Sequence, residues 1–191
     1  MTVGVLALQG DVIEHMRMTE AAGAEAVAVR YSREIEGLDG LIIPGGESTT
    51  VGKLMERFGL VEQIRRQAAR GLGVFGTCTG LILLSRDIEG SGQVRLGLMD
   101  FVVKRNAFGR QVDSFEADID IPAIGSPSMR AVFIRAPYIL SVGPGVEVLA
   151  RFEGKIVLAR QGRHLACAFH PEVISDTRLH RYFLDMLGGK V

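Results

Sequence analysis

Residues 1–85 alternate short apolar runs with segments that carry the start and stop signals of helices. Short apolar runs bounded by turn residues are typical of buried strands, and a capping residue before an apolar 3.6-residue period is typical of helices. The expected strands are 3–8, 26–30, 38–43 and 72–75, and the expected helices begin after Asp11, after a cap at Ser48 or Thr49, at 61 and at 79. Strands that alternate with helices form parallel units with right-handed crossovers. This pattern predicts a doubly wound α/β fold with a mainly parallel sheet.

Residues 98–169 differ, because strand-like segments follow one another with little helix between them. The expected strands are 98–103, 115–121, 129–134, 146–152, 156–160 and 165–169. Glu153-Gly154 and Gln161-Gly162 have the composition of hairpin turns, and Asp176 starts a last helix. We therefore expect antiparallel strands in the C-terminal half. No linker or repeat interrupts the sequence, which indicates a single domain over residues 1–191.

The balance of charge, the short first apolar run and the two cysteines limit the partners and the cellular locations expected for this chain. It has 22 basic and 22 acidic residues without single-sign blocks. Nucleic-acid binding requires a concentrated basic patch, so no nucleic-acid partner is expected. The first apolar run is interrupted at Gln9 and is too short for a signal peptide or a membrane span. Two cysteines without metal-ligand spacing indicate free thiols, no metal site and a cytoplasmic location.

The segment Gly76-Thr77-Cys78-Thr79-Gly80 lies between an apolar strand and an apolar helix. This is the pattern of a nucleophile elbow with cysteine in place of serine. Its glycines permit a sharp turn that exposes the nucleophile, and the backbone N–H of Thr79 can face a developing oxyanion. A helix N-terminus also favours the Cys78 thiolate. The alternative for Cys78 is a structural cysteine buried between two glycines.

The segment Phe169-His170-Pro171-Glu172 ends the last expected strand. Residues two apart in an extended segment point to the same side, so His170 and Glu172 can lie side by side. An imidazole can take the Cys78 thiol proton, and a carboxylate can orient the ring and stabilise its cation. A loop cap and a metal-ligand pair are the alternatives, although no third metal ligand is near in the sequence. We expect a triad of Cys78, His170 and Glu172.

The loop Pro44-Gly45-Gly46-Glu47-Ser48-Thr49 joins an expected strand to an expected helix. Its glycines let the backbone approach a ligand and offer N–H groups to an anion, which suits an oxyanion hole or a phosphate loop. A phosphate loop needs serine or threonine after Gly52-Lys53, where this chain has Leu54. We therefore expect an oxyanion hole formed by Gly45, Gly46 and Thr79.

Together, these three segments resemble those of the triad glutamine amidotransferases. Two more, Arg105–Phe115 and Phe133–Pro137, are similar to those of the glutaminase subunits of pyridoxal 5′-phosphate synthase, the PdxT type. The resemblance covers the chain from Val5 to the last helix, and five motifs in the same order are far more specific than any single motif.

The resemblance implies an activity, a partner and roles for individual residues. The chain would hydrolyse L-glutamine to glutamate and ammonia through a glutamyl thioester on Cys78, without a cofactor. It would deliver the ammonia to a synthase subunit of the PdxS type in a hetero-oligomeric complex that makes pyridoxal 5′-phosphate (vitamin B6). The implied glutamine-binding positions are Gly46, Glu47, Ser48, Arg105, Ile134 and Arg135. A guanidinium suits an α-carboxylate because it can make two charge-assisted bonds, although spacing alone favours solvated surface charges for both arginines.

Thr79 departs from the resemblance, because the family more often has alanine at this position. The backbone N–H is unaffected, but the branched side chain can alter access to Cys78. We expect Cys167 in the core, and we assign no chemistry to His15, His164 and His180.

Three rival classes remain open at this point. Peptidase-like or chaperone-like proteins with an elbow cysteine have no need of the Pro44–Thr49 loop. An amidotransferase of purine or histidine synthesis shares the triad but not the Arg105–Phe115 string. A binding subunit with a dead site would not keep an intact triad.

Overall fold

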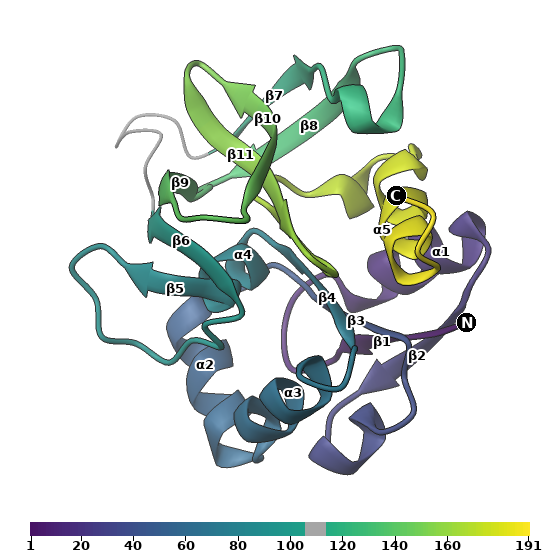
Figure 1. Cartoon of the computed structure of the whole chain (residues 1–191), viewed down its shortest axis with the longest axis vertical. Helices are drawn as coiled ribbons and strands as arrows, with labels where there is room; N and C mark the ends of the chain where they lie inside the picture. Colours follow the sequence, from purple (N-terminus) through teal and green to yellow (C-terminus); the bar gives the residue numbers. More distant parts are fainter. Residues whose placement is uncertain (106–113) are drawn as a thin grey trace.

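A sheet of ten strands organises the protein (Figure 1). The structure is a computed structural model that describes residues 1–105 and 114–191. The strand order is β2-β1-β3-β4-β12-β11-β9-β6-β5, with β10 paired to β11, and β7 and β8 form a second sheet. The strands are β1 Thr2–Leu6, β2 Glu25–Val29, β3 Gly40–Ile43, β4 Gly73–Thr77, β5 Ser85–Ile88, β6 Met99–Lys104, β7 Ser114–Ile119, β8 Met129–Ile134, β9 Tyr138–Val142, β10 Glu147–Phe152, β11 Lys155–Gln161 and β12 His164–Cys167.

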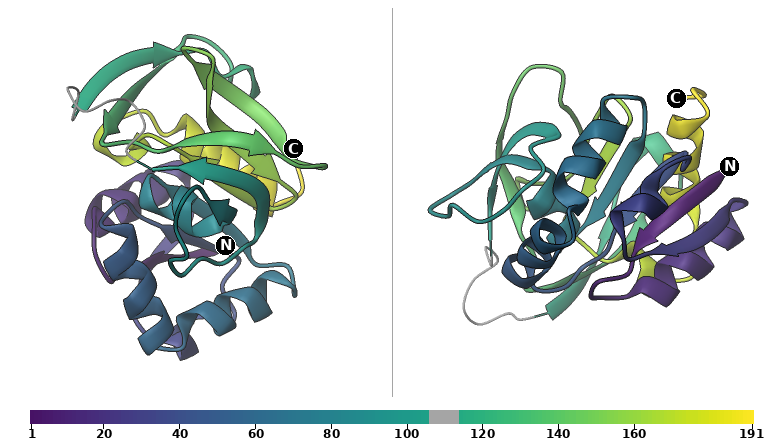
Figure 2. Two further views of the ribbon diagram at one scale, coloured as in Figure 1. Left: turned by 90° about the vertical axis from the view of Figure 1, so that its left-hand side faces the viewer. Right: turned by 90° about the horizontal axis from the view of Figure 1, so that it is seen from below.

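Helices cover both faces of the parallel part of the sheet (Figure 2). They are α1 Val12–Ala22, α2 Ser48–Arg57, α3 Leu60–Ala68, α4 Thr79–Leu84 and α5 Arg178–Leu187, with short 3-10 turns η1 Ser32–Ile35, η2 Pro122–Ile124 and η3 Pro171–Val173. Helices α1 and α5 pack together on one face, and α2 packs with α4 on the other. No helix of the described ranges is long and apolar enough to cross a membrane.

The five strands β2, β1, β3, β4 and β12 are mutually parallel. All residues of β3 and β4 are buried, as expected for strands covered by helices on both faces. Beyond β12 the pairing changes, because β11 runs antiparallel to β12, β9 and β10. The sequence-based prediction of a doubly wound sheet with antiparallel strands in the C-terminal half is therefore confirmed.

One of the two expected hairpin turns lies where the sequence predicts it, and the other is displaced by one residue. Glu153 and Gly154 join β10 to β11, and both have positive φ, 47° and 76°. The second turn lies one residue later than expected, because Gln161 pairs with His164 and still belongs to β11.

Two strands were not expected from the sequence. In β5, Arg86 and Asp87 are exposed and only the two end residues are buried, so the segment has little of the apolar character that indicates a strand. It is an edge strand held by parallel pairing to β6. The other, β9, is paired with β11 only at Ile139 and Ile156 and is otherwise paired to β6.

The N-terminal caps of three helices differ from the expectation. Glu47, and not Ser48 or Thr49, is the N-cap of α2, where its carboxylate accepts hydrogen bonds from two backbone N–H groups. An anionic side chain at that position also interacts favourably with the helix dipole. Asp11 is the N-cap residue of α1, but its side chain makes no capping hydrogen bond. Thr177 is the N-cap residue of α5, so the helix begins at Arg178, two residues beyond the expected start at Asp176.

The order of the strands places two distant segments beside each other. In the register of β4 and β12, Thr77 pairs with Cys167. The residues that follow these strands, Cys78 and His170, therefore leave the same edge of the sheet. In parallel α/β sheets this carboxyl edge is where ligands bind.

Candidate active site

Cys78 occupies a strained turn between β4 and α4. Its φ of 49° and ψ of −98° are rare for a residue with a side chain, and such strain persists only where the surrounding structure enforces it. The backbone N–H of Cys78 donates to the carbonyl of Cys167 at 2.8 Å. This bond ties the turn to β12 and holds the thiol at the carboxyl edge of the sheet, as in a nucleophile elbow.

The two glycines of the elbow are required by close packing. A Cβ on Gly76 would overlap the backbone of Gly80, and a Cβ on Gly80 would overlap the carbonyl of Ile43. The turn can therefore bring α4 directly against β3 and β4 only because neither position has a side chain.

His170 and Glu172 form a buried pair after β12. Nδ1 of His170 lies 2.8 Å from Oε1 of Glu172, and the two residues are 5% and 4% exposed. Proline between them starts the turn η3 and fixes the local backbone. The pair therefore has the arrangement of a ring oriented by a carboxylate.

The charges of the pair support each other. Burial lowers the pKa of His170, but the adjoining Cys78 thiol and the Glu172 carboxylate outweigh this effect and raise it to about 10. Burial raises the pKa of Glu172, but the neighbouring His15 and His170 outweigh this effect and hold the pKa well below its usual range. The arrangement thus favours an ionised Glu172 and an imidazolium beside Cys78.

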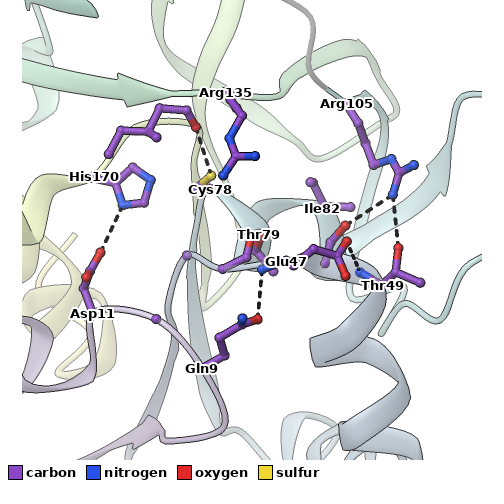
Figure 3. Close-up of a pocket in the computed structure, with 15 residues that line it drawn as sticks. Gln9, Asp11, Glu47, Thr49, Cys78, Thr79, Ile82, Arg105, Arg135 and His170 are labelled. Atoms are coloured by element: carbon purple, nitrogen blue, oxygen red, sulfur yellow. Dashed lines mark hydrogen bonds and ion pairs between the residues drawn. The ribbon is translucent and has the colours of Figure 1, made fainter. Parts of the chain in front are cut away.

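A pocket of about 490 Å³ opens at the carboxyl edge of the sheet. Figure 3 shows Cys78 between His170 and Arg135, with Arg105 farther along beside Thr49. Every site residue expected from the sequence lines this pocket except Glu172, which is buried on the far side of His170. The lining residues are Gln9, Gly10, Asp11, Gly45, Gly46, Glu47, Ser48, Thr49, Cys78, Thr79, Ile82, Arg105, Ile134, Arg135 and His170.

The expected oxyanion loop lies against the triad. A Cβ on Gly45 would come within 2.5 Å of Cε1 of His170, so only glycine permits this approach. The carbonyl of Gly46 accepts a hydrogen bond from the Thr79 hydroxyl, and the N–H of Glu47 donates to Oε1 of Gln9 at 3.0 Å. The Gly46–Glu47 peptide is therefore held at both ends.

The side chain of Glu47 caps the N-terminus of α2. Its carboxylate accepts from the hydroxyl and N–H of Thr50 and from the N–H of Thr49, and these bonds lower its pKa to about 2. The side chain is therefore anionic and fixed at the start of α2, on the wall of the pocket.

The two arginines reach the pocket in different ways. Nη1 of Arg105 donates to Oε1 of Gln93 and lies 3.4 Å from the hydroxyls of Ser48 and Thr49. Arg135 has a φ of 43°, a left-handed conformation that is uncommon for this residue type, and it projects toward Cys78 (Figure 3). Residues 106–113 of the string Arg105–Phe115 lie outside the described residues.

Ile134 contributes its backbone to the site. Sγ of Cys78 lies 3.9 Å from the carbonyl oxygen of Ile134, which precedes Arg135 at the end of β8.

The second cysteine, Cys167, is fully buried, and burial raises the pKa of its thiol well above the usual value. The expectation of a core position for Cys167 is confirmed.

Gln9 and Asp11 were not expected in the site. Both follow β1, so their place after a parallel strand was the signal that could have found them. Oδ2 of Asp11 lies 3.7 Å from Nδ1 of His170. Asp11, His170 and Glu172 are also the one group of possible metal ligands that converges within the described ranges. Nδ1 of His170 already faces Glu172 at hydrogen-bonding distance, as the expected triad requires.

Comparison with known proteins identifies the family. The model of the SNO glutamine amidotransferase family matches residues 5–188. The pyridoxal 5′-phosphate synthase subunit PdxT of Pelotomaculum thermopropionicum is 63% identical over 185 residues, which cover 97% of this chain and 94% of that protein. The PdxT subunit of Desulforudis audaxviator is 60% identical over 97% of this chain and 98% of that protein. A solved structure described as a glutamine amidotransferase has a TM-score of 0.93 and 51% identity, and the match covers 97% of this chain and 98% of that one. This chain therefore belongs to the SNO glutamine amidotransferase family.

Proposed function

We propose that this chain, as a single domain, is the glutaminase subunit of a pyridoxal 5′-phosphate synthase. The observation that carries the proposal is the meeting of a strained elbow cysteine with the buried pair of His170 and Glu172 at the wall of one pocket. The names of the relatives support the pathway, because they are pyridoxal 5′-phosphate synthase subunits that match almost end to end.

In the proposed reaction, the Cys78 thiolate attacks the side-chain carbonyl carbon of glutamine. The carbonyl electrons move to oxygen, and the oxyanion is stabilised by backbone N–H groups of the Gly45–Gly46 loop and Thr79. Each such donor typically contributes about 3–4 kcal/mol in the transition state. His170 gives its proton to the leaving nitrogen, and ammonia departs from a glutamyl thioester.

Water completes the reaction. His170, now neutral, takes a proton from water as it attacks the thioester, and glutamate leaves while Cys78 is regenerated. Glu172 keeps the ring oriented and stabilises its cationic form. The proposed glutamine-binding wall combines Arg105 and Arg135, whose charge suits an α-carboxylate, with Gly46, Ser48 and Ile134, and with the anionic Glu47, whose charge suits an α-ammonium.

The proposed partner is the synthase subunit that consumes the ammonia. A peptide between glycine and its neighbour rotates at low steric cost. The Gly46–Glu47 peptide is held by Thr79 and Gln9 in the free chain, and docking of the partner is the proposed trigger that completes the oxyanion hole.

The deciding experiment is ammonia release at saturating glutamine, with and without a synthase subunit of the PdxS type. We expect a low rate for the free chain, a much higher rate in the complex, and none for Cys78→Ala in either condition. A complex that releases no ammonia would refute the proposed function. Equal rates with and without the synthase subunit would refute the activation step alone.

A further inference from the structure

A line of buried polar side chains continues the triad away from the pocket. His15 on α1 and His180 on α5 are 0% and 1% exposed, and their helices pack side by side (Figure 1). Nδ1 of His15 lies 3.1 Å from Nε2 of His180. Nε2 of His15 lies 3.1 Å from the Thr77 hydroxyl and 3.3 Å from Oε2 of Glu172. Both histidines thus lie behind the carboxylate that orients His170.

The second oxygen of Glu172 determines where the His15 hydrogen lies. Within residues 1–105 and 114–191, Oε2 has no hydrogen bond of standard geometry, although it is buried beside Nε2 of His15. An unprotonated Nε2 would direct its lone pair toward a carboxylate oxygen, and this repulsion is costly in a low-dielectric interior. Nε2 of His15 therefore carries the hydrogen, which Glu172 and Thr77 share.

His180 fixes the other side of the His15 ring. Burial and the neighbouring His15 lower the pKa of His180 to about 3, so its ring is neutral and has one N–H. Its Nδ1 has no hydrogen-bond partner in the described part of the chain. Because buried N–H groups without an acceptor are rare, the hydrogen of His180 lies on Nε2 and points to Nδ1 of His15. If Nδ1 of His15 carried the hydrogen instead, the hydrogen of His180 would have to lie on Nδ1 of His180. That buried N–H would then have no acceptor within the described residues.

We propose that His15, oriented by His180, is a positioning residue of the triad that holds the second oxygen of Glu172. The inference rests on the proposed function and deepens it. His170 alone contacts one carboxylate oxygen and leaves the carboxylate free to turn about its last side-chain bond. A donor at the other oxygen removes this freedom and keeps the carboxylate ionised. In this arrangement His180 donates to Nδ1 of His15, and Nε2 of His15 donates to Glu172. The Glu172 carboxylate in turn stabilises the cationic form of His170.

Two substitutions at the same position separate positioning from packing. His15→Leu removes both ring nitrogens, whereas His15→Gln keeps an amide N–H near Nε2 and offers an acceptor for His180. His164→Leu is the matched control, because His164 is a half-buried histidine at the opposite ends of β4 and β12, where its Nδ1 accepts from the Val74 N–H at 3.2 Å. Thermal unfolding of each variant identifies those that fold.

The readouts are kcat and KM of the synthase-stimulated glutaminase and the pH dependence of Cys78 alkylation by iodoacetamide. We expect His15→Leu to lose about 10- to 100-fold in kcat, the loss typical when a residue that orients a metal ligand by a hydrogen bond is removed, with KM near the wild-type value. Its alkylation should be slower at neutral pH, and the acid limb of its kcat profile should move to higher pH, because Glu172 protonates more easily. His15→Gln should recover most of both losses, and His164→Leu should show neither.

A folded His15→Leu with the kcat and alkylation profile of the control would overturn the inference. If His15→Leu does not fold, His15→Gln and NMR of ¹⁵N-histidine in the wild-type protein decide, since ring nitrogen shifts report the tautomer. Nε2–H on both histidines supports the proposal, and Nδ1–H on His15 refutes it. An inactive wild-type complex whose Cys78 alkylation still depends on His15 would refute the glutaminase function and leave the positioning role intact.

Discussion

The hydroxyl of Thr79 donates a hydrogen bond to the carbonyl oxygen of Gly46. Since the N–H of Thr79 is an expected oxyanion donor, this bond brings a carbonyl oxygen, with its partial negative charge, to the wall where negative charge must develop. The opposite end of the same peptide is tied to Gln9. The loop therefore rests in an orientation that disfavours catalysis and that the Thr79 side chain helps to stabilise.

Thr79→Ala should raise the rate of ammonia release by the free chain. A neutral hydrogen bond contributes about 0.5–1.5 kcal/mol net, so we expect an increase of about two- to tenfold. The rate with the synthase subunit should change little, because the proposed activation step breaks this bond when the subunit docks. Steady-state rates of Thr79→Ala, Thr79→Ser and wild type test this, with Thr79→Ser retaining the low free rate. An unchanged free rate in Thr79→Ala would show that this bond does not restrain the loop.

Labelling should distinguish the two cysteines. Cys78 lines the pocket beside His170, whereas Cys167 is fully buried and its thiol pKa is raised by burial. A glutamine-analogue diazo-ketone should therefore modify Cys78 alone when the synthase subunit is present. Peptide mapping by mass spectrometry locates the adduct, and Cys78→Ala serves as the unlabelled control. An adduct on Cys167 would contradict the assignment.

The strain at Cys78 should be measurable as stability. Residues held in sparsely populated φ/ψ regions cost about 1–3 kcal/mol, and glycine avoids most of this cost at a positive φ. Cys78→Gly should therefore be more stable than Cys78→Ala by about 1 kcal/mol, although both lack the nucleophile. Urea denaturation of the two variants gives the difference in the free energy of unfolding. Cys78→Ala at least as stable as Cys78→Gly would indicate a relaxed turn.

His170 and Glu172 should act as one unit. His170→Asn removes the base and acid together, and we expect a loss of several orders of magnitude in kcat. Glu172→Gln leaves a misoriented ring, and loss of the orienting member of a triad can cost about 10⁴. The double variant should be little worse than His170→Asn, because the two residues share one function. Kinetics of the three variants in the complex decide this, and fully additive losses would speak against a shared role.

Stability should fall as the pH falls below neutral. Burial lowers the pKa of His164 to about 4 and that of His180 to about 3, whereas an unfolded histidine has a pKa of about 6.5. Below that pH these two histidines become protonated in the unfolded chain but stay neutral in the folded chain. The free energy of unfolding therefore decreases toward pH 4. Glu172, with its lowered pKa, adds to the loss in more acidic solution.

His170 has the opposite dependence. Its pKa is raised to about 10, so its contribution is complete below the unfolded value and is lost as the pH rises toward 10. Urea titrations across the pH range measure both limbs. His164→Gln should flatten the acid limb, and His170→Asn should flatten the alkaline one. Constant stability between about pH 6.5 and 4 would contradict the burial of neutral histidines.

Local patterns in the sequence were sufficient for the parallel half of the sheet and for the surroundings of the triad. The elbow around Cys78 and the pair of His170 and Glu172 are short motifs whose geometry follows from a turn and from an extended strand. Strand β5 was missed because its two central residues are charged and exposed, which leaves no apolar run to indicate a strand. The N-cap was misplaced because Glu47 uses a longer side chain than the usual capping residues.

The remaining features depend on which strands and helices become neighbours. Gln9 and Asp11 enter the pocket because β1 ends at the same edge as β4, and His15 meets Glu172 only because α1 packs beside η3. Spacing within the sequence contains no information on a contact between residues as distant as His15 and His180. Such polar groups can be found only when the packing of the core is known.

The position of β12 has a consequence for synthesis of the protein on the ribosome. This strand follows every other strand of the described chain, but it lies between β4 and β11 in the sheet. Until it emerges, β4 and β11 each present an unpaired edge, which is a template for wrong pairing. The nascent chain also lacks His170 and the carbonyl of Cys167 that ties down the Cys78 turn. In the proposed mechanism, hydrolysis of glutamine must therefore wait until β12 and His170 have been synthesised, and a product terminated before them carries Cys78 without the imidazole that would protonate the leaving ammonia.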